Sequence, residues 1–177
     1  FYHRLTHNTD FSRQACAEKI VMDENGLFAQ VEITTSGLSK MPLRAKGQYA
    51  AALCCNLYGR KKYKIGNKVC HKFPRIYDDD KEVFIKDVCD ETVIGYKYFN
   101  FEGQTTMAIK YRGGGTGKLL IQVAENGSML TEYNVTPVDI WRKVKKEVNF
   151  PSGKHPLFIS YKGKGKIDIK EITFNEN

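Results

Sequence analysis

Hydrophobic and polar residues alternate with a period of two along most of the second half of the chain. Eight runs carry this pattern: Val83–Val88, Thr92–Phe101, Thr106–Tyr111, Lys118–Glu125, Leu130–Val135, Lys143–Phe150, Leu157–Tyr161 and Lys166–Phe174. Such alternation is typical of antiparallel strands that bury one face. Glycine and proline separate the runs, and the pair Asn126 and Gly127 is a strong signal for a two-residue hairpin. The pattern predicts an all-β fold, a jelly-roll β-sandwich.

The first third of the chain has shorter patterns. Strand-like runs at Lys19–Met22 and Leu27–Ile33 flank a turn that ends in Gly26, where a positive φ is needed. Ala50–Leu57 is apolar and predicts a further strand, with a helix as the alternative because Ala and Leu favour helices.

Composition divides the chain into three zones. Residues 59–81 are poor in apolar residues, rich in Lys and Arg, and predict a linker with a lead-in strand. Residues 82–177 form the expected sandwich, and residues 1–58 form a separate N-terminal zone. The chain begins without Met, so we expect it to be a piece of something longer.

Charge and length exclude several classes of protein. The 177 residues are 41% hydrophobic, which favours a packed core over disorder. The net charge of +8 would suit nucleic acid, but the densest basic group, residues 60–64, reads more naturally as a solvated linker. No apolar run approaches the ~20 residues of a membrane-spanning helix. We therefore expect no nucleic acid and no membrane as partners.

The cysteines and histidines do not indicate a metal or redox site. Cys16, Cys54, Cys55, Cys70 and Cys89 contain no C-x-x-C pair, and the four histidines are scattered. Most of the cysteines are expected to be small buried hydrophobes.

The sandwich region resembles a known family. The landmarks are Gly95–Phe99, a glycine-rich loop, the run GKLLIQV, Trp141, FPSGKHPLFISYKG and Ile167–Phe174. In this order they resemble a carbohydrate-binding module of family 6 over about residues 75–175. Those modules are jelly rolls that bind xylan, β-glucan or related chains, so the resemblance implies a plant polysaccharide or oligosaccharide as partner.

The resemblance also implies site residues. Trp141 and Tyr96 match the two landmark aromatics of the family cleft, and Asp168 lies near the position of its asparagine. Alternation along the strand puts Tyr98 on the same face as Tyr96, opposite the core residues. The open alternative is that these rings are simply core, as most aromatics in strands are.

A structural Ca²⁺ is common in such sandwiches. The resemblance suggests Asp168 with Glu82, or with one of the three aspartates at 78–80, as some of its ligands. Calcium needs six to eight oxygens, and plain surface charges are the alternative reading.

The N-terminal zone resembles a different family. The stretch FYHRLTHNTDFSRQACAEKIVMDENGLFAQVE is similar to the end of the catalytic domain of glycoside hydrolase family 43, a five-bladed β-propeller. His3 and Arg13 match a propeller-centre histidine and an arginine near the −1 sugar subsite. The three carboxylates of such enzymes come from earlier blades, which precede Phe1. The resemblance therefore implies strands of a last blade with no catalysis of their own.

Together these resemblances predict a non-catalytic carbohydrate-binding or accessory region of a plant-polysaccharide-degrading glycoside hydrolase. The implied parent is of the β-xylosidase or α-L-arabinofuranosidase type, is secreted by a bacterium to the extracellular space or periplasm, and contributes its catalytic propeller as a partner. Two alternatives remain open: a structural accessory domain that binds no sugar, and a basic β-sandwich adhesin or nucleic-acid binder. Exposure of Trp141 separates the first two, and clustering of Lys and Arg on one face would favour the third.

Overall fold

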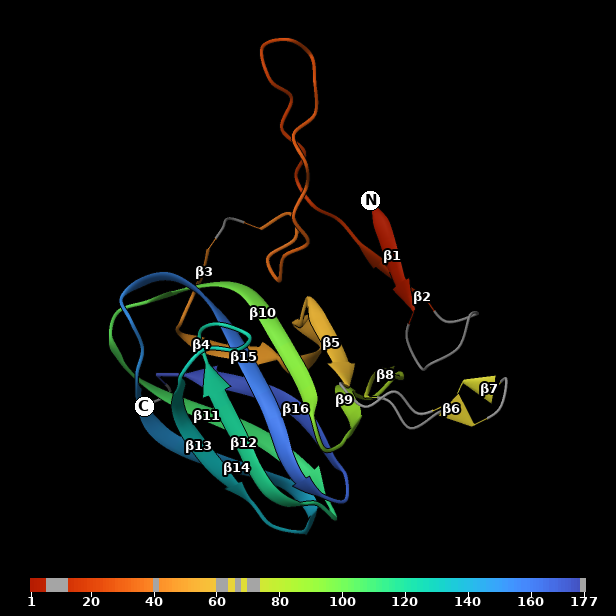
Figure 1. Cartoon of the computed structure of the whole chain (residues 1–177), viewed down its shortest axis with the longest axis vertical. Helices are drawn as coiled ribbons and strands as arrows, with labels where there is room; N and C mark the ends of the chain where they lie inside the picture. The colour runs from red at the N-terminus through yellow and green to blue at the C-terminus, as the bar shows by residue number, and fades with distance from the viewer. Residues whose placement is uncertain (6–12, 40–41, 60–63, 66–67, 70–73, 176–177) are drawn as a thin grey trace.

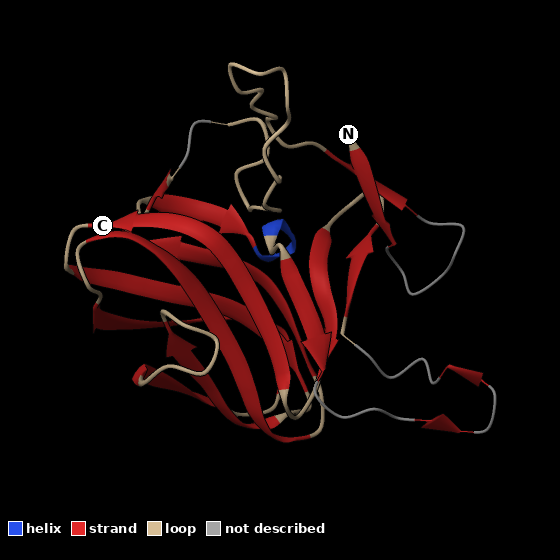
Figure 2. Ribbon diagram, turned by 45° about the horizontal axis from the view of Figure 1, so that its top comes forward, coloured by secondary structure: helices blue, strands red, loops and turns tan. Residues whose placement is uncertain are grey.

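Two six-stranded sheets stack face to face in the computed structural model (Figure 1; Figure 2). The structure describes residues 1–5, 13–39, 42–59, 64–65, 68–69 and 74–175. The elements before residue 80 are β1 Tyr2–Leu5, β2 Arg13–Cys16, β3 Leu43–Arg44, β4 Gly47–Ala50, the 3₁₀ turn η1 Ala51–Leu53, β5 Asn56–Gly59, β6 Lys64–Ile65, β7 Lys68–Val69 and β8 Arg75–Asp78. The later strands are β9 Val83–Val88, β10 Thr92–Phe101, β11 Gln104–Gly113, β12 Thr116–Gln122, β13 Met129–Val135, β14 Val138–Asn149, β15 Gly153–Lys164 and β16 Ile167–Phe174.

The strands divide between two sheets that we name after a central strand. The β10 sheet has the order β13-β12-β15-β10-β3, and β5 also pairs with β10. The β16 sheet has the order β14-β11-β16-β9-β8, and β4 also pairs with β16. Except for β3, the pairs within both sheets are antiparallel. The predicted jelly-roll sandwich is confirmed, and each of the eight predicted strands is present.

Aromatic side chains fill the space between the sheets. The largest fully buried side chains include four tyrosines and five phenylalanines: Tyr96, Tyr111, Tyr133, Tyr161, Phe84, Phe99, Phe101, Phe150 and Phe174. All of them except Phe84 belong to the inter-sheet core. Phe101 and Phe150 stack with ring centroids 4.1 Å apart. Burial of this apolar surface is the main force that holds the two sheets together.

The prediction of one continuous strand over Ala50–Leu57 is wrong, because a turn interrupts it. β4 ends at Ala50, η1 turns the chain, and β5 begins at Asn56. Ala51 and Cys54 are buried in the core, and the hydroxyl of Tyr96 donates a 2.9 Å hydrogen bond to the carbonyl of Ala51. The turn lets the chain cross from the β16 sheet to the β10 sheet, which a straight strand does not allow.

The sandwich begins earlier in the chain than the sequence suggested. β3, β4 and β5 lie within the predicted N-terminal zone, yet they pair with β10 and β16. The lead-in strand expected between residues 59 and 81 is present as β8, which pairs with β9.

The two strands expected around Gly26 form only a narrow arm, residues 18–35, that projects from the sandwich (Figure 1). One bridge, between Met22 and Phe28, joins its two legs. The carboxylate of Asp23 accepts hydrogen bonds from the N–H groups of Asn25 and Leu27, and Gly26 has a φ of 79°. The turn is therefore as predicted, whereas the strands around it are not formed. None of the helices in the described part of the chain is long and apolar enough to span a membrane.

Candidate functional site

Trp141 lies on the outer face of the β16 sheet within a group of charged side chains. Its indole N–H donates a 3.1 Å hydrogen bond to Glu82, and its ring meets Phe84 edge-on with centroids 5.4 Å apart. The guanidinium carbon of Arg112 lies 4.2 Å from the centroid of the indole ring. One face of this half-buried ring is thus occupied by the chain's own cation.

Arg112 also joins the carboxylates that the sequence singled out. Its guanidinium lies 3.3 Å from Asp168 and 3.4 Å from Glu82. Lys170 adds a 2.8 Å ion pair to Glu82. This hydrogen bond from Lys170, reinforced by the nearby positive charges, holds the pKa of Glu82 below its usual value. The structure therefore brings Trp141, Asp168 and Glu82 together, around an arginine that the sequence did not indicate.

The network continues to Asp87 near the end of β9. Asp87 accepts ion pairs from Arg75 and Lys166, and its N–H donates to Asp168. Asp87 has a φ of 61°, a conformation that non-glycine residues rarely adopt. Each carboxylate in this network has a cationic partner, so the network is satisfied by the chain itself.

The predicted calcium ligands do not fit that ion in this arrangement. Asp168 and Glu82 both face Arg112 rather than a free space. No group of three His, Cys, Asp or Glu side chains able to hold a metal occurs among the residues that the structure describes. Calcium needs six to eight oxygens, so binding here stays a prediction without a supporting ligand set.

The prediction that Tyr96 presents an exposed ring is wrong. Tyr96 is fully buried, because β10 carries one extra residue between Tyr96 and Phe99 opposite β15. This β-bulge interrupts the alternation, and Tyr96 faces the core together with Phe99. Tyr98 remains half-buried at the surface, with Lys154 4.3 Å from its ring centroid.

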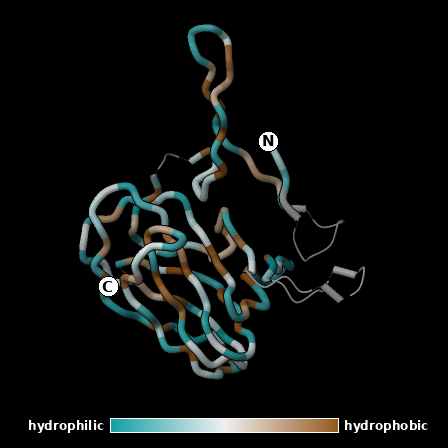
Figure 3. Tube along the Cα trace, in the orientation of Figure 1, coloured by the Kyte–Doolittle hydropathy of each residue, from teal (hydrophilic) through white to brown (hydrophobic). Residues whose placement is uncertain are grey.

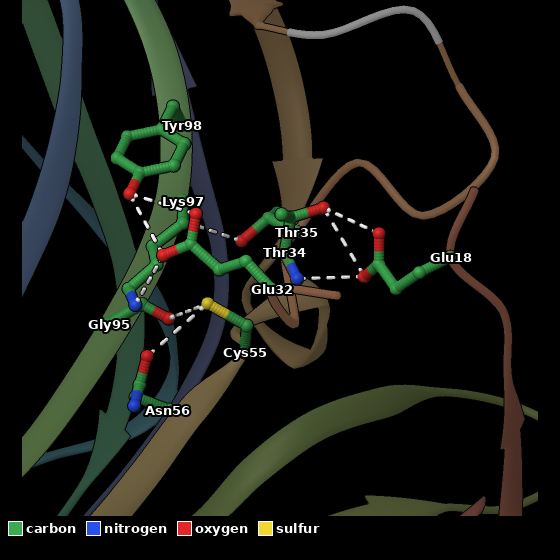
Figure 4. Close-up of polar contacts among 9 residues, drawn as sticks. All are labelled: Glu18, Glu32, Thr34, Thr35, Cys55, Asn56, Gly95, Lys97 and Tyr98. Atoms are coloured by element: carbon green, nitrogen blue, oxygen red, sulfur yellow. Dashed lines mark hydrogen bonds and ion pairs between the residues drawn. The ribbon is translucent and has the colours of Figure 1, made fainter. Parts of the chain in front are cut away.

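Tyr98 takes part in a polar contact between the arm and β10 (Figure 4). Its hydroxyl donates a 2.9 Å hydrogen bond to Glu32, which also forms a 2.9 Å ion pair with Lys97. The Thr35 N–H donates a 2.6 Å bond to the Lys97 carbonyl, and the Lys97 N–H donates back to the Thr35 hydroxyl. We name these contacts the latch. Tyr98 thus has a structural role that the sequence did not predict.

The two residues matched to a glycosidase subsite lie in the N-terminal hairpin. His3 is exposed on β1, opposite Ala15 of β2. Arg13 opens β2 opposite Leu5, and its side chain lies outside the described part of the structure. The basic residues 60–63 also lie outside the described ranges. On the outer face of the β16 sheet, Lys110 and Lys143 are cross-strand neighbours, and both form ion pairs with Glu171 of β16.

A groove of about 280 Å³ lies on the outer face of the β10 sheet. Its floor contains Val93, Ser160 and Leu120, which lie side by side on β10, β15 and β12. Its rim contains polar side chains: Glu91, Gln122, Glu125, Asn126 and Lys162. The sequence analysis missed this groove, although Asn126 belongs to the hairpin signal that forms one wall.

Tyr58 lies next to two of the residues that line this groove. It lies on β5 opposite Val93, and its hydroxyl donates a short hydrogen bond to Glu125 of the β12–β13 loop. The floor thus combines apolar side chains with a serine beneath a polar rim, and the volume lies just below the typical range of ~300–1,000 Å³ for small-ligand sites.

Comparisons with known proteins find similarity to one curated protein and to several solved structures. No family model matches the chain. A xylosidase/arabinosidase of Thermoclostridium stercorarium is 35% identical over 98% of this chain, and the chain spans 38% of that protein's length.

Solved structures with the same fold have low sequence identity. The module CsCBM6-3 of Clostridium stercorarium, solved with cellobiose, has a TM-score of 0.61 at 14% identity, covering 76% of this chain and 97% of the module. A family 43 arabinoxylan arabinofuranohydrolase of Bacillus subtilis, solved with cellotetraose, has a TM-score of 0.59 at 14% identity, covering 90% of this chain and 33% of the enzyme. As predicted, the chain is similar over nearly its whole length to part of a xylosidase/arabinosidase, and its sandwich has the fold of the family 6 carbohydrate-binding modules.

Proposed function

We propose that the chain is a non-catalytic region of a plant-polysaccharide-degrading glycoside hydrolase and that it binds oligosaccharide in the groove on the β10 sheet. The relationship to a xylosidase/arabinosidase and the fold shared with sugar-binding modules support this proposal. The observation that carries it is the groove itself, with Leu120 and Ser160 in its floor and a polar rim.

The groove matches the chemistry of a sugar ring. A pyranose has apolar C–H faces, which suit the half-buried Leu120, and hydroxyls around its edge. Carboxylates accept hydrogen bonds from hydroxyls, lysine donates them, and amides do both, so Glu91, Gln122 and Lys162 provide both roles. Such contacts replace hydrogen bonds to water, so the affinity for a single site is expected to be weak.

The parent's activity lies outside this chain in our proposal. Family 43 catalysis requires carboxylates that the resemblance assigns to earlier propeller blades, and the chain matches only 38% of its relative. We expect the parent to be secreted, because plant polysaccharides are extracellular. His3 and Arg13 then serve that parent's sugar subsite.

A second function is supported by the arrangement around Trp141. A platform for stacking needs an open ring face, and Arg112 lies over this one at 4.2 Å. This observation favours an accessory domain that stabilises its parent without binding sugar at Trp141, Tyr98 and Asp168.

Calorimetric titration with xylo-, arabino- and cello-oligosaccharides separates the two functions. We expect the variant Asn126→Ala/Lys162→Ala to bind at least ~10-fold more weakly than wild type, since each lost polar contact contributes about 1 kcal/mol. The matched control Asn134→Ala, an exposed asparagine on β13 outside the groove, should bind normally. Loss of binding in Trp141→Ala alone would move the site to the β16 sheet. No binding of any oligosaccharide by the wild type would favour the accessory function.

A further inference from the structure

The groove on the outer face of the β10 sheet carries an excess of negative charge. Hydrophobic and hydrophilic residues alternate along the strands of the sandwich, as the brown and teal stretches in Figure 3 show, so charged side chains gather on the outer faces of the sheets. Among the residues that line the groove, Glu91 and Glu125 are carboxylates and Lys162 is the single cation. The charge of a ligand should therefore affect its binding here.

Glu125 is held at the groove by its neighbours. The hydroxyl of Tyr58 on β5 donates a short hydrogen bond to its carboxylate. The β12–β13 loop that carries Glu125 is tied to β12, because the side-chain amide of Gln122 donates a 2.5 Å hydrogen bond to the Gly127 carbonyl. A carboxylate fixed in this way can still accept a hydrogen bond from a ligand hydroxyl, but it cannot rotate away from a second negative charge.

Glu91 is placed beside the groove by an unusual backbone conformation. It lies in the turn between β9 and β10 with a φ of 63°, and its N–H donates a 2.9 Å hydrogen bond to the Tyr161 carbonyl. Glycine and asparagine adopt a positive φ more readily than glutamate does, so the backbone alone does not account for this residue. A strained position beside a groove points to a role for its side chain. The neighbouring Asp90, whose carboxylate accepts a 3.1 Å hydrogen bond from the Gly163 N–H, adds to the negative charge.

Lys162 offsets only part of this negative charge. It is exposed on β15, directly opposite Lys118 of β12, whose ammonium forms a 2.5 Å ion pair with Glu132. A lysine ammonium lies at the end of a flexible four-carbon stem, so Lys162 can turn into solvent. A negatively charged ligand would thus meet two carboxylates that are held beside the groove and one cation that is not.

We propose that the groove selects neutral sugar chains and rejects chains whose branches carry a uronic acid, with Glu91 and Glu125 as the residues that determine this specificity. The inference rests on the proposed function and adds the charge class of the ligand. The hydroxyls of a neutral branch donate hydrogen bonds to both carboxylates, whereas a uronate brings a further group that only accepts and has the same charge. Like charges brought together at an interface weaken binding, and such repulsion is a common source of specificity.

Titration calorimetry with two ligands that differ only in charge tests the proposal. The first ligand is a xylo-oligosaccharide with one glucuronic acid branch, and the second is the same compound after reduction of its carboxyl group to an alcohol. At low ionic strength we expect the wild type to bind the neutral compound at least ~5-fold more tightly, because like charges in the groove repel. This difference should disappear in ~1 M salt, which screens exposed charges. The comparison needs no variant that has to fold.

A charge-removing variant assigns the effect to its residues. Glu91→Gln/Glu125→Gln keeps the size and the hydrogen-bond acceptors of both side chains, so its affinity for the neutral compound should stay within about twofold of wild type. Its affinity for the glucuronic acid compound should rise at least ~5-fold. The matched control Glu102→Gln/Glu147→Gln removes two exposed carboxylates outside the groove and should discriminate as the wild type does.

Three results would overturn the proposal. Equal affinity of the wild type for the two compounds at low ionic strength shows that charge is not selected. Tighter binding of the glucuronic acid compound, lost in Lys162→Gln, assigns the groove to uronates instead. Binding of a linear xylo-oligosaccharide but of neither branched compound shows that the groove excludes branches by size. Failure of every neutral oligosaccharide to bind is a separate outcome, because it removes the proposed function and this inference together.

Discussion

Arg112 covers the ring of Trp141, with its guanidinium carbon 4.2 Å from the ring centroid. The same guanidinium lies within 3.4 Å of Glu82 and Asp168. Arg112 therefore lies over the ring that was predicted to stack on a sugar, and it pairs with the two carboxylates that were predicted to bind calcium.

Replacing Arg112 with methionine should uncover the tryptophan. The substitution Arg112→Met removes the charge and the planar group, so quenching of Trp141 fluorescence by acrylamide should increase. The stability cost should be about 1 kcal/mol, because the side chain is partly exposed. Arg142→Met is the control, since Arg142 bonds Thr136 rather than the indole. Unchanged quenching in Arg112→Met would show that Arg112 does not cover the ring in solution.

Periodicity predicted the strands because each one buries a single face against the other sheet. Val83–Val88 and Thr92–Phe101 have the bounds that alternation suggested. The orientation of Tyr96 was missed because one extra residue in β10 shifts the side chains that follow it. A β-bulge depends on the pairing with β15, far along the chain, and leaves no mark in the local pattern.

The candidate groove was missed for a similar reason. Its floor joins Val93, Leu120 and Ser160, which are brought together by pairing between three strands. Arg112 reaches Asp168 because β11 and β16 are neighbours in this register. Neither relationship is visible in a short motif, whereas the hairpin turn at Gly26 is local and was predicted.

The hydroxyl of Tyr96 should stabilise the turn between the sheets. In Tyr96→Phe, the Ala51 carbonyl loses its 2.9 Å buried hydrogen bond. We expect the free energy of unfolding to fall by about 1–2 kcal/mol, measured by urea denaturation. Tyr98→Phe, which changes a half-buried tyrosine on the same strand, should lower the free energy of unfolding by a smaller amount. An equal loss in both variants would contradict the role of the buried bond.

Gly95 allows β10 and its neighbours to pack closely. A Cβ at this position would lie 2.8 Å from the Phe158 ring and 3.0 Å from the Cβ of Asn56. Gly95→Ala should therefore destabilise the fold by about 1–3 kcal/mol, measured by thermal unfolding. Adding Phe158→Leu should recover part of that loss, because the contact is removed. Gly114→Ala, where a Cβ meets nothing within 4 Å, is the matched control.

The latch should open in acid. The hydrogen bond from Lys97, with a further one from Tyr98, holds the pKa of Glu32 below its ordinary value of 4.5, and the same pairing raises the pKa of Lys97 above 10.5. The pKa of Glu32 is lower in the folded protein than in the unfolded chain. Its contribution to folding stability is therefore fully present above pH 4.5 and is lost as the pH falls through the folded-state pKa. The pKa of Lys97 is higher in the folded protein than in the unfolded chain. Its contribution to folding stability is therefore fully present below pH 10.5 and is lost as the pH rises through the folded-state pKa. The latch should accordingly be closed between these two values.

The amide of Thr35 reports the state of the latch, because it donates a 2.6 Å bond to the Lys97 carbonyl. Its NMR shift should titrate below pH 4.5 in wild type, and this titration should be absent from Glu32→Gln. High salt should weaken the pair, since Glu32 is about half exposed. The control is Glu24→Gln, at the tip of the same arm, in which the Thr35 amide shift should titrate as in wild type. A Thr35 shift that does not change with pH in wild type would show that the ion pair does not hold the arm to β10.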